Sequence, residues 1–148
     1  MAVTPNSIVT PQTPIASTAV ATTANTTYTD TPTNTVQLLA AQTNGARLQK
    51  ITALARATVT ATELQLYVSS DGGTTKRFIG SKLMTAYTVA ATTAQTAIDF
   101  GYTDAAPLIL SAAESLWVAI GVTNTGIVFR AEGYAYECKT APLCSRRE

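Results

Sequence analysis

The stretch Glu63-Leu64-Gln65-Leu66-Tyr67-Val68-Ser69-Ser70 alternates apolar and polar side chains along residues 63–70. Its apolar members recur at every second position, which is the period of a β-strand with one buried face. Asp71-Gly72-Gly73 follows directly, and glycine after aspartate is typical of a tight turn between two strands. The stretch therefore predicts a half-buried strand that ends in a hairpin.

Further short segments along the chain also have the character of β-strands. Residues 116–122 are apolar on both faces, as expected of a central strand that is covered on each side. Only residues 81–89 could hold a helical turn. Short strands separated by turn signals predict an all-β fold, an antiparallel β-sandwich of the jelly-roll or immunoglobulin-like kind. The strand segments are residues 35–40, 48–57, 63–70, 76–79, 96–100, 108–110, 116–122 and 126–136.

The N-terminal part of the chain differs from the rest in composition. Asp30 is the only charged residue before Arg47, and three prolines recur in a Thr-, Ser- and Ala-rich background before residue 25. We expect an extended arm over residues 1–25, a β-sandwich domain over 26–136 and a C-terminal tail over 137–148. An arm of this kind binds partners by strand addition, and its apolar anchors are predicted to be Ile8, Val9, Ile15 and Val20.

The charge of the chain excludes some classes of partner. The 148 residues carry a formal net charge of +1, and only 13% of them are charged. A nucleic-acid-binding domain normally presents a basic face, so we expect no nucleic-acid partner. No run of residues is long and apolar enough for a membrane span, and the first residues lack the pattern of a signal peptide. We therefore expect synthesis in a cytoplasm and no membrane partner.

Catalysis is not expected either, because the chain contains no histidine. Triads and His-based general bases are thereby excluded, and no glycine-rich phosphate loop is present. We expect no catalytic residue, cofactor, metal site or small-molecule substrate. A carboxylate pair for glycoside hydrolysis is the remaining enzymatic alternative, and its candidates lie near predicted strand ends and turns. They are Glu63, Asp71, Asp99, Asp104, Glu114 and Glu132.

The turn after residues 63–70 resembles one repeat of a known motif. Ser69-Ser70-Asp71-Gly72-Gly73-Thr74-Thr75 is similar to the Asp-box of sialidase-like propellers, with Lys76 where that pattern has tryptophan. Propellers repeat the motif in each blade, whereas it occurs once here. We interpret it as a hairpin turn in which Gly72 or Gly73 supplies a positive φ and Asp71 caps the turn.

Cys138 and Cys144 are the only cysteines, and both lie in the predicted tail. A tail that folds back at Pro142 would allow a disulfide within the chain, whereas an extended tail places their Cα atoms about 20 Å apart. Bonds between chains and free thiols are the alternatives.

The aromatic residues allow two interpretations. Aromatic rings could line a sugar-binding face, but their positions within predicted strands favour a role in the core or in a subunit interface. They are Phe78, Phe100, Trp117, Phe129, Tyr134 and Tyr136.

The Thr- and Ala-rich β pattern of residues 57–74, together with the N-terminal segment, resembles small virion structural proteins of tailed bacteriophages. The likeness extends from about residue 1 to residue 136, and it is closest to capsid decoration (cement) proteins. It implies a non-enzymatic protein on the capsid surface that stabilises the shell by bridging neighbouring capsid subunits. Its implied partners are the major capsid protein and copies of itself in a homotrimer. A tail, baseplate or glycan-binding receptor component is the alternative.

Overall fold

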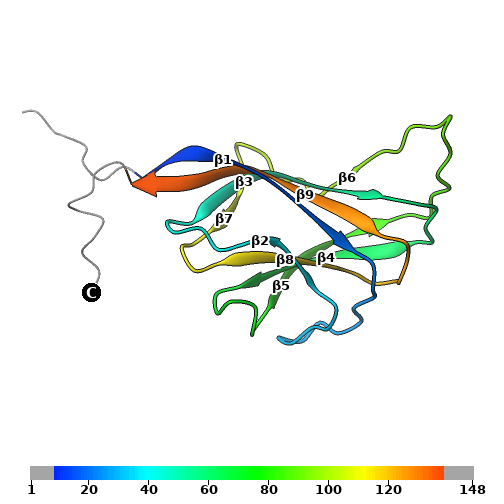
Figure 1. Cartoon of the computed structure of the whole chain (residues 1–148), viewed down its shortest axis with the longest axis horizontal. Coiled ribbons are helices and arrows are strands. Elements are labelled where there is room, and N and C mark those ends of the chain that lie inside the picture. The colour runs from blue at the N-terminus through cyan, green and yellow to red at the C-terminus, as the bar shows by residue number, and fades with distance from the viewer. Residues whose placement is uncertain (1–8, 139–148) are drawn as a thin grey trace, which may run out of the picture.

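The computed structural model describes residues 9–138, with side chains from residue 13 to residue 137. Nine strands form two antiparallel sheets that pack face to face as a β-sandwich (Figure 1). The five-stranded sheet contains β1 (Val9–Ala21), β9 (Ile127–Cys138), β3 (Ala46–Ala55), β6 (Ile98–Asp99) and β7 (Leu108–Leu110). The four-stranded sheet contains β2 (Val36–Leu39), β8 (Ser115–Ile120), β4 (Thr62–Ser69) and β5 (Arg77–Met84). The predicted β-sandwich is confirmed.

The strand order identifies which kind of sandwich this is. The five-stranded sheet runs β1-β9-β3, with β6 and β7 both paired to the far edge of β3, and the four-stranded sheet runs β2-β8-β4-β5. The first strand thus pairs with the last, β1 with β9. Within this pair, β2 pairs with β8, β3 with β6 and β7, and β4 with β5. A long antiparallel ribbon rolled into two sheets in this way is a jelly roll. The strands of residues 9–138 do not follow the immunoglobulin-like order.

The core lies between the sheets and follows the two-residue period of the strands. In β4, Leu64 and Leu66 are fully buried and point inward. Leu116, Val118 and Ile120 of β8 lie beside them on the inner face of the same sheet, and Phe129 of β9 belongs to the same core from the other sheet. Burial of large apolar side chains contributes about 1.5–3 kcal/mol each, so this layer dominates the stability of the domain.

The predicted arm is in part a strand of the sandwich. Residues 9–21 form β1 and pair along their length with β9, so the expected boundary between arm and domain at residue 25 does not hold for the described residues. Pro11 and Pro14 are tolerated because β1 is an edge strand. The register of β1 shifts between Pro11 and Thr13, as in a β-bulge. As a result, Pro11 lies opposite Tyr136 and Pro14 lies opposite Tyr134, two positions apart on β9.

Two other boundaries also differ from expectation. Residues 81–84, the start of the only segment that could have held a helical turn, complete β5, and Tyr87 forms an isolated bridge with Val59. At the C-terminus, β9 continues to Cys138, which pairs with Val9, so the tail begins two residues later than expected.

No helix that could cross a membrane is found within residues 9–138.

Candidate functional site

The four predicted anchors of the N-terminal segment do not share one surface. Ile8 lies outside the described residues, and Val9 is placed by its backbone alone, opposite Cys138. Ile15 packs against the core of its own chain, which removes it from the surface expected to bind partners. Val20 is 36% exposed and lies in one row with Val128 and Leu54 on the outer face of the five-stranded sheet.

Residues 22–34 cross the outer face of the four-stranded sheet and bury polar groups there. Asn25 is fully buried, and its Nδ2 donates to Gln65 Oε1 and to Tyr67 Oη, both at 2.9 Å. Gln65 Nε2 donates to the Asn25 carbonyl (3.2 Å), and the Asn25 N–H donates to the Ile120 carbonyl (2.7 Å). These bonds explain why Gln65 and Tyr67, which point away from the core, are buried. Residues 22–34 thus pack against the four-stranded sheet of their own chain.

The same face carries an exposed aromatic pair, Tyr28 and Phe78. Their ring centroids are 5.3 Å apart in an edge-to-face arrangement, and Phe78 also lies 5.4 Å from the buried ring of Tyr67. Tyr28 is 52% exposed, and its hydroxyl donates to the Glu63 carboxylate. We call Tyr28 and Phe78 the aromatic pair.

Ionisation on this face follows from the hydrogen bonds and from burial. The bond to Glu63 and then burial raise the pKa of Tyr28. Burial acts to raise the pKa of Glu63, but hydrogen bonds from Tyr28, Ser81 and Gln65 outweigh it, so the pKa of this carboxyl is lowered. Burial raises the pKa of Tyr67 to about 12. Glu63 is therefore ionised, and both tyrosines are neutral, at physiological pH.

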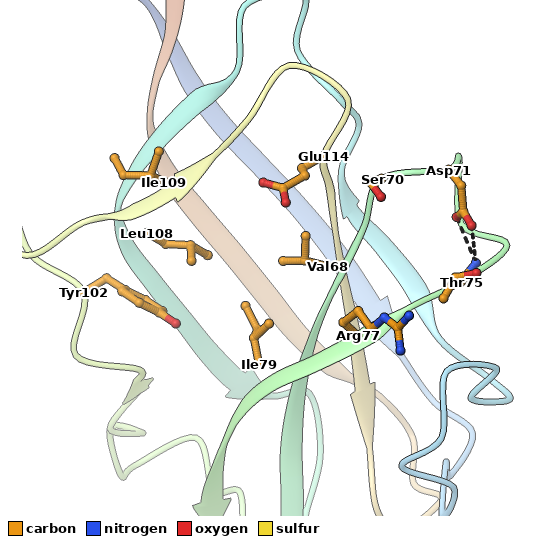
Figure 2. Close-up of a pocket in the computed structure, with 10 residues that line it drawn as sticks. All are labelled: Val68, Ser70, Asp71, Thr75, Arg77, Ile79, Tyr102, Leu108, Ile109 and Glu114. Carbon is orange, nitrogen blue, oxygen red and sulfur yellow. Dashed lines mark hydrogen bonds between the residues drawn. The ribbon is translucent and has the colours of Figure 1, made fainter.

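A groove opens between β5 and β7, which are edge strands of the two sheets (Figure 2). It has a volume of about 520 Å³, within the range of about 300–1,000 Å³ typical of ligand pockets. Val68, Ile79 and Leu108 supply its apolar side, and Asp71 and Glu114 lie on its polar side. We call this the β5–β7 groove.

The two carboxylates of the β5–β7 groove are held by backbone donors in turns. The Thr75 N–H donates to both oxygens of Asp71 (2.8 and 3.0 Å), and Ser69 Oγ donates to Asp71 Oδ1 (2.8 Å). These bonds hold the pKa of Asp71 at about 2. Glu114 Oε2 accepts from the Ser111 N–H at 2.7 Å. Backbone donors thus fix the orientation of both carboxylates.

The turn itself has the predicted geometry. Gly72 and Gly73 both have positive φ, 73° and 96°, and Asp71 caps the turn, which confirms the interpretation as a hairpin. A Cβ on Gly73 would overlap the ring of Trp117. Lys76 also lies over the Trp117 ring, with its Nζ 4.7 Å from the ring centroid.

The remaining acids expected as enzymatic candidates do not assemble around one site. Asp104 forms an ion pair with Arg47 at 2.9 Å, and Glu132 pairs with Arg130 at 2.6 Å. Asp99 Oδ1 accepts from the Gly101 N–H at 2.8 Å. Among residues 9–138, no group of three His, Cys, Asp or Glu side chains could hold a metal ion.

The other predicted residues are distributed as follows. Phe129 is fully buried and Phe100 packs against the core, whereas Phe78 is 39% exposed. Cys138 ends β9, and Cys144 lies outside the described residues, so their disulfide stays a prediction. Asn25 and Tyr28 were not predicted from the sequence, because their partners are about 40 positions away. The exposed side chain of Ile109 was not predicted either, although three consecutive apolar residues in a strand already indicate one on the outer face.

Comparison of the chain with family models, with curated proteins and with solved structures gave no match.

Proposed function

We propose that this chain is a non-enzymatic structural protein of a bacteriophage virion, which decorates and stabilises the capsid by bridging neighbouring subunits. Its partners in this proposal are the major capsid protein and copies of itself, as a homotrimer on the capsid surface. It assembles onto the shell in the host cytoplasm and requires no cofactor, nucleic acid or membrane.

One observation carries the proposal, the distribution of exposed apolar side chains over the sandwich. Val20, Val128 and Leu54 form a row on the outer face of the five-stranded sheet. The aromatic pair lies on the outer face of the other sheet, and Ile79 and Ile109 flank the β5–β7 groove between the sheets. Three separate apolar patches on a domain with a net charge of +1 suit a protein that contacts several neighbours at once.

The neighbours of a capsid lattice fit this distribution better than one soluble partner does. A single partner covers one patch, whereas a bridging protein touches several subunits through small contacts. Linked weak contacts raise the overall affinity by about 10²–10⁴ over any one of them. Each patch can therefore be small.

The test is binding to shells from which the protein has been removed, followed by mass photometry of the protein alone and of the mixture. We expect a discrete oligomer that re-adds to the shells, and we expect Leu54→Lys to weaken re-addition at least tenfold. Thr33→Lys adds the same charge at an exposed position outside the three patches and serves as the matched control. A monomer that ignores the shells would contradict the proposal.

The aromatic pair supports a second candidate, a tail, baseplate or receptor-binding component that binds host glycans. Exposed aromatic rings stack on sugar rings, and Tyr28 and Phe78 present such rings beside the polar groups of Glu63 and Ser81. A glycan array distinguishes the two candidates. Saccharide binding that is lost in Phe78→Ala and retained in Leu54→Lys would favour the second.

A further inference from the structure

The β5–β7 groove exposes apolar groups that no other part of the described chain covers. Ile79 is 39% exposed although it is flanked by Val68 and Leu108 within the groove. It sits at a register shift in β5, which turns its side chain toward the gap between the sheets. Burying this surface would be favourable by about 25 cal/mol for each Å² removed from water.

The charges that line the groove without an ion-pair partner are negative. Arg77 is the cation of the groove, and Asp30 pairs with it on the surface. Asp71 and Glu114 accept backbone hydrogen bonds but form no ion pair with a described residue. The groove is therefore complementary to an extended segment that combines an apolar side chain with positive charge.

Of the two segments outside the described residues, only the C-terminal one has this chemistry. Residues 1–8 carry no charged side chain. Residues 139–148 carry Lys139, Arg146 and Arg147 against one acid, Glu148, and they contain Leu143 between Pro142 and Cys144. Their net charge is thus positive, and Leu143 offers the apolar group.

The geometry of the five-stranded sheet fixes the distance from the end of β9 to the groove. Tyr134 of β9, Arg47 of β3 and Ile109 of β7 lie opposite one another on adjacent strands. Two strand spacings put Ile109 about 10 Å from Tyr134, and β9 ends four residues further on. An extended segment of ten residues reaches about 33 Å, which is enough to leave one copy and cross onto the next.

A seat in the groove of the same chain is geometrically unfavourable. Cys138 lies about 16 Å from Ile109 by the spacings above, and the five residues from Cys138 to Leu143 span about 16 Å when fully extended. The segment would have to reverse its direction directly after β9 and remain fully stretched. A groove on a neighbouring copy imposes no such reversal.

We propose that the β5–β7 groove receives residues 139–148 of a neighbouring copy, with Leu143 against Ile79 and Leu108 and the cationic side chains beside Asp71 and Glu114. This inference rests on the self-association in the proposed function and names the contact that produces it. It requires no shell, so it is tested on the purified full-length protein and is judged separately from capsid binding.

The first test is disulfide trapping with the natural Cys144. In a Cys138→Ser background, Ser70→Cys places a thiol at the groove, and Thr18→Cys places one on the outer face of the five-stranded sheet as a control. Mild oxidation should join chains through Cys144 at least tenfold faster in the Ser70→Cys variant. Equal rates in the two variants would overturn the proposal. A bond confined to one chain, detected as a monomer by mass, would overturn the assignment to a neighbour.

The second test alters the groove and the tail in the same trapping assay. Ile79→Asp should slow crosslinking about tenfold, whereas Leu83→Asp should not, because Leu83 is 64% exposed on the opposite face of the same strand. A free peptide of residues 139–148 in excess should suppress crosslinking, and a peptide with Leu143→Ser, Arg146→Ser and Arg147→Ser should not. The peptide competition decides the question even if a groove variant fails to fold. Equal suppression by both peptides, or by neither, would contradict the proposal.

Discussion

Asn25 joins residues 22–34 to the outer face of the four-stranded sheet, which would otherwise be exposed to solvent. Its side chain satisfies Gln65 and Tyr67, two groups that point away from the core yet are buried. Asn25→Ala would remove the buried donor to Gln65 Oε1 and to Tyr67 Oη, at a cost of about 1–3 kcal/mol in the free energy of unfolding. Chemical denaturation measures this loss. Thr26→Ala, at an exposed neighbouring position, is expected to change stability by less than about 0.5 kcal/mol.

Asp71 contributes a pH-dependent term to stability. Its pKa is lowered from 3.8 to about 2 in the folded chain, so its ionised form is favoured by folding. The contribution is present above about pH 4 and disappears as the pH falls toward 2. We expect Asp71→Asn to be less stable than the natural chain at pH 7, and we expect the difference to shrink as the pH falls from about 4 through 2, as measured by thermal unfolding across this range. A constant difference at all pH values would contradict this assignment.

At the scale of elements, the pairing of β3 with β9 depends on a glycine. Gly133 lies opposite Leu48 at the register shift of β3, and a Cβ built there would overlap the Arg47 carbonyl oxygen and the Leu48 Cα. Gly133→Ala should therefore destabilise the domain by about 1–3 kcal/mol, because backbone atoms must move to accommodate the methyl group. Gly80→Ala is the control, since its added Cβ meets nothing within 4 Å. Thermal unfolding of the two variants distinguishes a steric effect from loss of glycine flexibility.

The start of β1 divides the N-terminal segment into two parts. Residues 9–21 cover β9 and contribute Ala19 and Ala21 to the core, whereas residues 1–8 precede the strand. Deletion of residues 1–8 should leave the melting temperature within a few degrees of that of the full chain. Deletion of residues 1–21 should abolish the cooperative transition, because it leaves one edge of β9 unpaired and removes Ala19 and Ala21 from the core. Circular dichroism of both deletions tests this, and a folded chain without β1 would contradict it.

At the scale of the whole molecule, the jelly roll pairs the first strand with the last. The contact of β1 with β9 joins residues that are more than 100 positions apart, and the other pairs nest within it. Folds dominated by such distant pairings form slowly, because loop-closure entropy is lost before the contacts form. We expect refolding in milliseconds to seconds, followed by tryptophan fluorescence of Trp117. Microsecond refolding would contradict this expectation.

The sequence predicted the strands better than their arrangement. The alternation of Leu64, Leu66 and Val68 predicted β4, and the doubly apolar run near Trp117 predicted β8 as a central strand. β1 was assigned to an arm because its prolines and threonines are typical of a segment without a core. That pattern is also compatible with an edge strand, and only the partner strand distinguishes the two. The turn at Asp71 was predictable because its hydrogen bonds are local.

The amino-acid sequence by itself determined the all-β class, the turns and the inward faces of the central strands, because these depend on neighbours along the chain. Tertiary structure alone decided the jelly-roll order, the burial of Asn25 and the β5–β7 groove. Each of these joins residues distant in the sequence, and the side-chain pattern of a strand records which face is buried but not which strand lies beside it. The same physical reason explains why the groove and the aromatic pair became visible only in the folded chain.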